Sequence, residues 1–225
     1  MSIEFKIVDC PTPTISEGIC RQEYTQISES EGIKLGGNSW GGWDTLHALR
    51  TSGAWSTSKR EYRMQLKAWK AGLAPKPVSL NVVLDQGRYK KFNPCFRMEH
   101  VGTTMLRSAY TTSGVSWKDY DRVALALTAR LLCAGIAHHD LHASNIIVDI
   151  SRKFNRAHIN RVWAIDFEYS NNVRKMSLEK AKKEAAELQS HRLVDYYSVA
   201  SFLAAKDFGD DPNWYGPHQT ERKTA

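Results

Sequence analysis

The sequence predicts a mixed α+β fold, because strand-like apolar runs occur beside longer stretches with helical periodicity. The runs Ile146-Ile147-Val148 and 162–165 are short, aliphatic and flanked by polar residues, as buried strands are. Three longer stretches, 56–78, 116–140 and 177–209, repeat apolar residues at the spacing of amphipathic helices. At 225 residues the chain can bury a sizeable core.

The first predicted helix lies within 56–78. One of the hydroxyl residues at 56–58 is expected to cap its start, and Gly72 and Pro75 are expected to end it. The aliphatic segment 33–35 lies upstream and is predicted to be a strand. A loop rich in Gly, Ser and Trp, with one helical turn, is expected between that strand and the helix.

The second predicted helix runs from a cap at Ser116 to Gly135 and leads into a loop rich in His. The two aliphatic runs that follow this loop are predicted to pair as a hairpin. The polar and basic stretch 150–161 between them is expected to be an exposed connection. The third helical stretch contains Asp195, which is expected to support the loop structurally.

The most specific pattern is H-x-D-L-x-x-x-N, then an aliphatic strand, then a second aliphatic strand that ends in Asp-Phe. It contains Asp140, Asn145 and Asp166, which the hairpin is expected to bring together. Amide and carboxylate oxygens on two loops suit Mg²⁺, which takes a few hard oxygen ligands and water. Asp140, outside that metal sphere, is placed to receive the proton of a hydroxyl.

This pattern resembles the catalytic and metal-binding loops of the protein-kinase-like superfamily. The resemblance implies a two-lobed kinase-like fold, with a small β-rich N-lobe over 1–101 and a reduced helical C-lobe over 102–225. It implies ATP and Mg²⁺ as cofactors. It also implies Asp140 as the catalytic base, with Asn145 and Asp166 as the metal ligands.

The resemblance extends to the expected nucleotide site. Lys34 and Glu61 are the candidates for the ion pair that orients the phosphates, and an ordinary surface Lys and a solvated helix-start Glu are the alternatives. Backbone groups near Glu99 and Val101 are expected to bind adenine. The pattern G-x-G-x-x-G is absent before Lys34, and Gly18 alone matches a residue of such a phosphate-binding loop.

Three departures from the protein-kinase pattern leave the identity of the phosphate acceptor undecided. His139 replaces the usual Arg, Glu168 replaces the usual Gly, and His142 follows the catalytic Asp-Leu. The loop IDFEYS is similar to that of choline and ethanolamine kinases, and DLH to that of aminoglycoside phosphotransferases. The first expectation is a serine/threonine protein kinase. The alternatives are a small-molecule kinase of choline, aminoglycoside or sugar type, and a pseudokinase that binds a partner.

Composition and charge bound the remaining expectations. The net charge is +7, but the basic residues are spread along the chain, so no specific nucleic-acid partner is expected. No apolar run has membrane-spanning length. Four scattered cysteines indicate reduced thiols and a cytoplasmic protein. A monomer is expected, with a loosely ordered tail from about 209. The small size resembles that of compact kinase-like effectors that bacteria secrete into host cells.

Overall fold

The computed structural model of the chain contains both helices and strands, which confirms the predicted α+β class. The chain forms two compact units, residues 1–103 and 104–225. The two-lobed kinase-like arrangement stays a prediction. The structure describes residues 2–8, 24–26, 30–35, 42–85, 91–102, 106, 109, 115, 117–153 and 156–190.

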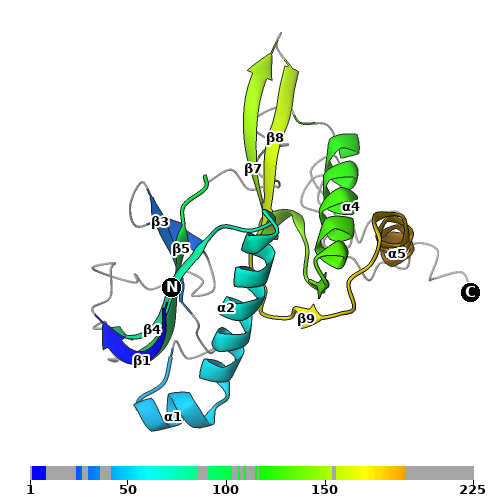
Figure 1. The fold of residues 1–225 in the computed structure, drawn as a ribbon. Helices are drawn as coiled ribbons and strands as arrows, with labels where there is room; N and C mark the ends of the chain where they lie inside the picture. Colours follow the sequence, from blue (N-terminus) through cyan, green and yellow to red (C-terminus); the bar gives the residue numbers. More distant parts are fainter. Residues whose placement is uncertain are drawn as a thin grey trace, which may run out of the picture. The chain divides into compact units, whose positions relative to one another are not determined.

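The first unit contains a five-stranded sheet in the order β1-β4-β5-β3-β2 (Figure 1). Strand β1 runs parallel to β4, and the other neighbouring strands are antiparallel. Strands β4 and β5 carry most of its buried apolar side chains, which are Leu80, Val82, Val83, Cys95, Phe96 and Met98. The strands are β1 (Ser2–Val8), β2 (Tyr24–Gln26), β3 (Glu31–Leu35), β4 (Pro77–Asp85) and β5 (Lys91–Glu99).

Two helices precede β4. The short helix α1 (Leu46–Thr51) is the helical turn expected after the first predicted strand. Helix α2 (Ala54–Lys70) begins earlier than predicted and has Gly53, at φ 78°, as its N-cap, so the cap predicted at 56–58 was wrong. Glycine adopts this left-handed conformation without steric cost, so the chain can turn into the helix three residues before the earliest predicted cap. Gly72, at φ 72°, follows the helix end as predicted.

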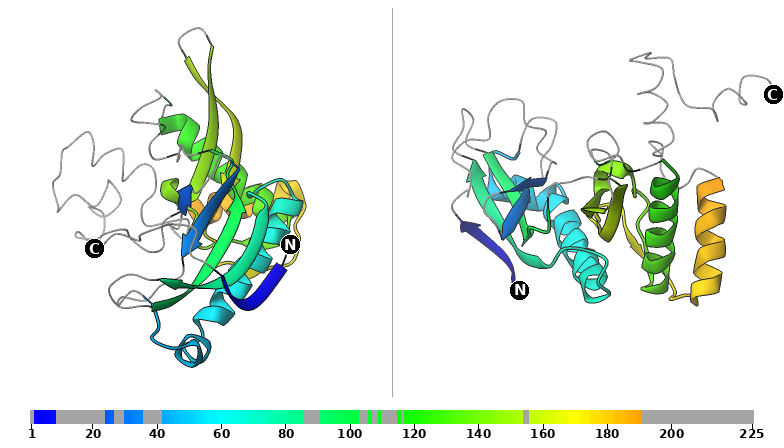
Figure 2. Two further views of the ribbon diagram at one scale, coloured as in Figure 1. Left: turned by 90° about the vertical axis from the view of Figure 1, so that its left-hand side faces the viewer. Right: turned by 90° about the horizontal axis from the view of Figure 1, so that it is seen from above.

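Helix α2 packs on one face of this sheet (Figure 2). The ring of Tyr62 contacts that of Phe96 on β5, with 5.5 Å between centroids. Phe96 pairs in register with Leu80 on β4, which is fully buried. Burial of these large side chains is the main force that holds the helix on the sheet.

The second unit combines two longer helices with two small antiparallel sheets. Its two helices lie within the predicted helical stretches 116–140 and 177–209. Its elements are α4 (Trp117–Cys133), β6 (Ile136–Ala137), the 3₁₀ turn η1 (Ala143–Asn145), β7 (Ile146–Lys153), β8 (Arg156–Ala164), β9 (Asn171–Asn172) and α5 (Leu178–Ser190).

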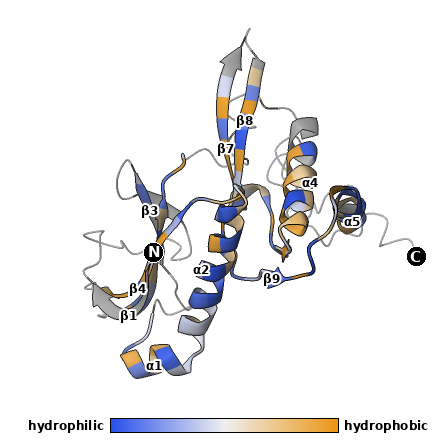
Figure 3. Cartoon of the chain, in the orientation of Figure 1, coloured by the Kyte–Doolittle hydropathy of each residue, from blue (hydrophilic) through white to orange (hydrophobic). Residues whose placement is uncertain are grey.

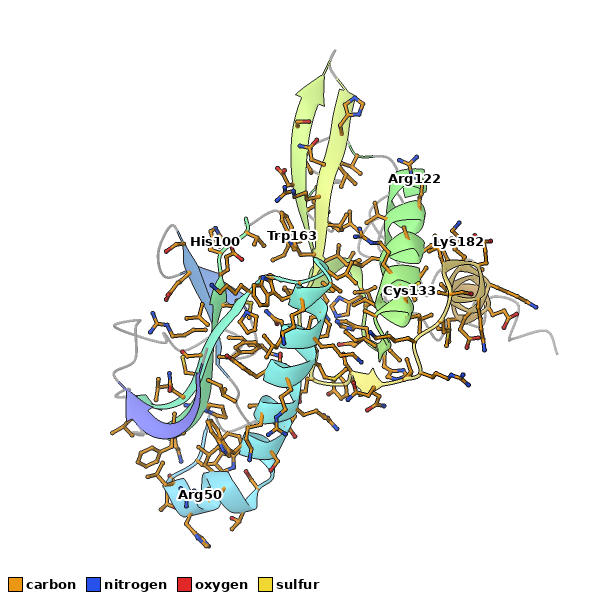
Figure 4. All side chains as sticks on the ribbon, in the orientation of Figure 1. Arg50, His100, Arg122, Cys133, Trp163 and Lys182 are labelled. Carbon is orange, nitrogen blue, oxygen red and sulfur yellow. The ribbon has the colours of Figure 1, made fainter. Side chains whose placement is uncertain are left out.

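Helices α4 and α5 lie side by side through small residues. Ala129 of α4 and Ala181 and Ala185 of α5 are buried in one cluster. Cys133, labelled in Figure 4, packs against the cluster, whereas Lys182 on α5 is exposed. Figure 3 shows α5 as mostly hydrophilic, which fits a helix that buries one narrow side.

The hairpin of β7 and β8 is longer than predicted (Figure 1). Its base matches the prediction, since Ile146 pairs with Ala164 and Ile147 with Trp163. The stretch 150–161 was expected to be a connection, but most of it continues the two strands, and Ile150 pairs with Ile159. Backbone pairing with aliphatic residues at matched positions extends the ladder although the stretch is polar.

Several predicted features fall on residues that the structure does not describe. They include Gly18, the cap at Ser116, the segment around Asp195 and the tail from 209. None of the helices in the described part of the chain is long and apolar enough to cross a bilayer.

Candidate active site

In the first unit, Lys34 and Glu61 form a buried ion pair. Lys34 Nζ lies 2.9 Å from Glu61 Oε1, and each side chain is 6% exposed. Strand β3 sets Lys34 opposite Phe96, so the Lys side chain shares the sheet face on which α2 packs. Removing two charges from water is costly, so a buried ion pair is weak support for stability and a reason to suspect function. The predicted role in orienting phosphates stays a prediction.

Gln65, one helical turn after Glu61, lies deeper in the same unit. Its Nε2 donates to the carbonyl oxygen of Pro75 at 3.1 Å and lies 3.5 Å from the sulfur of Met98. Its Oε1 and the hydroxyl of Tyr62 are buried without a hydrogen-bond partner in the described residues. Burial raises the pKa of Tyr62. Gln65 was not predicted, because no local sequence pattern marks a contact with a residue 33 positions away.

The predicted adenine-binding segment follows β5. The backbone N–H of Glu99 donates to the carbonyl oxygen of Lys76 at 2.8 Å, and that of His100 donates to Ser30 at 2.9 Å. An adenine contact at Glu99 would therefore use its carbonyl oxygen. The contacts at Glu99 and Val101 both stay predictions, and Gly18 lies outside the described residues.

In the second unit, hydrogen bonds hold the loop that bears Asp140. Gly135, at φ 76°, follows α4 and turns the chain into this loop. Asn145 is buried, and its Nδ2 donates to the Asp140 carbonyl oxygen at 2.9 Å and to Asp140 Oδ2 at 3.3 Å. The amide thus fixes the carboxylate while its own Oδ1 is the atom left for a metal ion.

His138 connects this loop to the segment before Asp166. The backbone N–H of Asp140 donates to His138 Nδ1 at 3.3 Å, so the proton of the neutral ring is on Nε2 and is donated to the Ile165 carbonyl oxygen at 3.0 Å. Burial lowers the pKa of His138 to about 4. The ring of Phe167 lies against it, with 4.8 Å between centroids. A neutral His138 therefore joins the two loops.

Asp166 and His139 have left-handed backbone conformations, with φ of 64° and 65°. They are the two positive-φ residues other than glycine in the described part of the chain. Such conformations cost about 1–3 kcal/mol and cluster at functional sites. At Asp166 the conformation sets the direction of the predicted metal ligand.

The side-chain oxygens of Asn145 and Asp166 are of the kind that Mg²⁺ binds. Asn145 and Asp166 lie on adjoining segments, because the Ile165 N–H donates to the Asn145 carbonyl oxygen at 2.9 Å. The structure brings the predicted amide and carboxylate ligands into one region of this unit. The described residues contain no cluster of three or more His, Cys, Asp or Glu side chains able to hold a metal. Magnesium bound here would complete its coordination with phosphate oxygens and water.

His142 was not predicted as a site residue. Its Nδ1 accepts from the Ser144 N–H at 3.2 Å, which caps η1, and its Nε2 lies 3.9 Å from Asp140 Oδ2. The sequence could have indicated a role for His142, because this residue lies only two positions after the predicted base, Asp140. Ser170, also missed, is buried and donates from its hydroxyl to the His138 carbonyl oxygen at 3.2 Å.

The candidate residues thus form two groups. Lys34 and Glu61 meet in the first unit, and Asp140, Asn145 and Asp166 belong to the second.

Comparison with solved structures finds several similar chains. The chain is similar to the Rio2 kinase of Chaetomium thermophilum in a complex with ADP/Mg²⁺ and phosphoaspartate, with TM-score 0.43 and 15% identity over 85% of this chain and 62% of that one. It is similar to WaaP in complex with acyl carrier protein, with TM-score 0.41 and 10% identity over 77% of this chain and 67% of that one.

A third similar structure is WbdD, with TM-score 0.43 and 17% identity over 77% of this chain and 36% of that one. The chain thus spans about 62% of the Rio2 kinase chain and about a third of WbdD. All three TM-scores are below 0.5, so the roles of residues rest on contacts within this chain. No family model and no curated protein matches the sequence.

Proposed function

We propose that this chain is an ATP- and Mg²⁺-dependent phosphotransferase that phosphorylates a Ser or Thr hydroxyl of a protein. The observation that carries the proposal is the link between the two loops of the second unit. His138 joins the segments of Asp140 and Asp166, and the amide of Asn145 holds the carboxylate of Asp140. These contacts support a candidate base and two candidate metal-binding oxygens in one small region.

In the proposed reaction the acceptor oxygen bonds to the γ-phosphorus of ATP. The bond from that phosphorus to the β–γ bridging oxygen breaks, and ADP leaves. The hydroxyl proton passes to the carboxylate of Asp140, whose side chain is 32% exposed and therefore accessible. Asn145 and Asp166 would hold Mg²⁺, which neutralises phosphate charge. The Lys34 ammonium, fixed by Glu61, would bind the α- and β-phosphates.

A small-molecule acceptor is the second candidate. Tyr169 follows Asp166 by three residues, and its side chain is 60% exposed. An exposed aromatic ring beside the metal-binding segment could bind the cationic group of an amino alcohol. A role as a secreted effector, a cytoplasmic location and a monomeric state stay predictions from the sequence.

The two acceptor classes separate in one experiment. The chain is incubated with γ-labelled ATP, Mg²⁺ and either heat-treated cell lysate or a panel of hydroxyl-bearing metabolites. Label on protein bands supports the first proposal, and label on a metabolite supports the second. Asp166→Ala should abolish either signal, whereas Asp149→Ala, at an exposed carboxylate on β7, should retain it. No transfer by the unaltered chain would favour a partner-binding pseudokinase.

A further inference from the structure

The imidazole of His142 has a fixed orientation beside Asp140. The backbone N–H of Ser144 can only donate, so Nδ1 of His142 must accept the 3.2 Å hydrogen bond. The proton of the neutral ring is therefore on Nε2, and Nε2 is directed toward the carboxylate. The cap on η1 thus determines which nitrogen faces the candidate base.

The separation between these two groups leaves room for a third atom. Nε2 of His142 lies 3.9 Å from Oδ2 of Asp140, which is too long for a direct hydrogen bond. Two atoms at this separation can both lie about 2.6–3.2 Å from an oxygen between them. Both side chains are partly exposed, 25% for His142 and 32% for Asp140, so a substrate can reach them.

We infer that His142 binds and orients the acceptor hydroxyl. The hydroxyl donates its hydrogen to Asp140, and Nε2–H of His142 donates to one lone pair of the same oxygen. The other lone pair is then directed at the γ-phosphorus. His142 keeps its proton throughout, and the hydroxyl proton goes to Asp140 as the new O–P bond forms. This role rests on the proposed phosphotransferase function and goes beyond it by assigning an acceptor-binding residue.

A purely structural role for His142 makes a different prediction. The cap on Ser144 needs an acceptor near the position of Nδ1, and Asn is among the best N-cap residues. His142→Asn should therefore keep the cap but lose the donor at Nε2. His142→Gln places an amide N–H farther from the backbone, nearer the position of Nε2. The two variants separate the cap from the contact with the acceptor.

The test measures steady-state phosphoryl transfer, nucleotide affinity and thermal unfolding for the unaltered chain, His142→Asn and His142→Gln. We expect His142→Asn to keep the melting temperature and ATP affinity, to raise KM for the acceptor and to lower kcat/KM about tenfold or more. His142→Gln should recover part of that loss. His158→Asn, at an exposed His on β8, is the matched control and should change nothing.

Three results overturn the inference, and they are distinguishable. If His142→Asn transfers phosphate with unaltered KM and kcat, His142 is a cap alone, and the proposed function stands. If kcat/KM falls only in step with the melting temperature, the role is likewise structural. If the unaltered chain neither binds Mg²⁺·ATP nor transfers phosphate, the proposed function fails, and this role fails with it.

Discussion

Asn145 donates a hydrogen bond from Nδ2 to the carboxylate of Asp140 at 3.3 Å and a second to its carbonyl oxygen at 2.9 Å. One amide thus positions the candidate base and presents its own oxygen as a candidate metal ligand. These two roles would place the base at a fixed position relative to a bound metal ion. This coupling is the basis of the first prediction.

Asn145→Ala should impair both catalysis and the response to metal. We expect transfer to fall about a hundredfold or more, because a misplaced base loses most of its contribution. The Mg²⁺ concentration at half-maximal rate should also rise. A magnesium titration of initial rates measures both effects. Asn160→Ala, at an exposed amide on β8, is the control and should leave the titration unchanged.

The buried pair of Lys34 and Glu61 predicts that stability and activity can be separated. Lys34→Met leaves a buried carboxylate without this ammonium and should lower the free energy of unfolding by about 3–5 kcal/mol. The double variant Lys34→Met/Glu61→Leu should regain most of that stability, yet remain inactive. Urea unfolding and a transfer assay measure the two effects.

The control for this pair is an exposed one. Lys182 Nζ lies 3.3 Å from Glu179 Oε1, with side chains 56% and 85% exposed. Lys182→Met should therefore change stability by less than about 1 kcal/mol. If the double variant of the buried pair keeps full transfer activity, the phosphate-binding role of Lys34 is wrong.

The left-handed conformation of Asp166 predicts an unusual order of stability. At φ 64° a Cβ is strained, so Asp166→Gly should be about 1 kcal/mol more stable than Asp166→Ala, with both inactive. At Asp149, within strand β7, the order should reverse, because glycine weakens a strand. Urea unfolding of the four variants tests both orders. An Asp166→Ala protein at least as stable as Asp166→Gly contradicts the strained geometry.

Burial of His138 predicts that the protein loses stability in mild acid. Its pKa is lowered from 6.5 to about 4 in the folded state, so between these pH values the unfolded chain binds the extra proton. Stability from this group is therefore complete above pH 6.5 and falls as the pH decreases toward 4. The loss is about 1.4 kcal/mol for each pH unit within that window.

Urea unfolding at several pH values between 4 and 7 measures this slope. His138→Gln should flatten it, whereas His158→Gln, at an exposed residue, should retain it. An unchanged slope in His138→Gln would show that other groups cause the acid sensitivity.

The sequence predicted those features that have a local pattern. The base of the hairpin at Ile146 and Ala164 follows from two aliphatic runs, and the helix end before Gly72 follows from a common stop signal. The N-cap of α2 at Gly53 was not predicted, because hydroxyl side chains are usually the better helix caps. The extension of the hairpin was not predicted, because its residues are mostly polar and the strands there pair through backbone hydrogen bonds.

In the candidate site, too, the features with a local sequence pattern were predicted and those that depend on tertiary packing were not. The spacing of Asp140 and Asn145 is a local signature, and the predicted hairpin accounts for the proximity of Asp166. The contact of Gln65 with Met98 and the buried hydroxyl of Ser170 depend on tertiary packing, which a single sequence does not reveal. The tautomer of His142 likewise depends on a backbone N–H that only the fold places.

The most direct test of the central claim is a single-turnover measurement with γ-labelled ATP and an acceptor identified as above. Asp140→Asn should bind Mg²⁺·ATP as tightly as the unaltered chain, because Asp140 is expected to lie outside the metal sphere. Its rate of phosphoryl transfer should be about 10²–10⁴-fold lower. An Asp140→Asn protein that transfers phosphate at the unaltered rate would contradict the assignment of this loop as the site of the reaction.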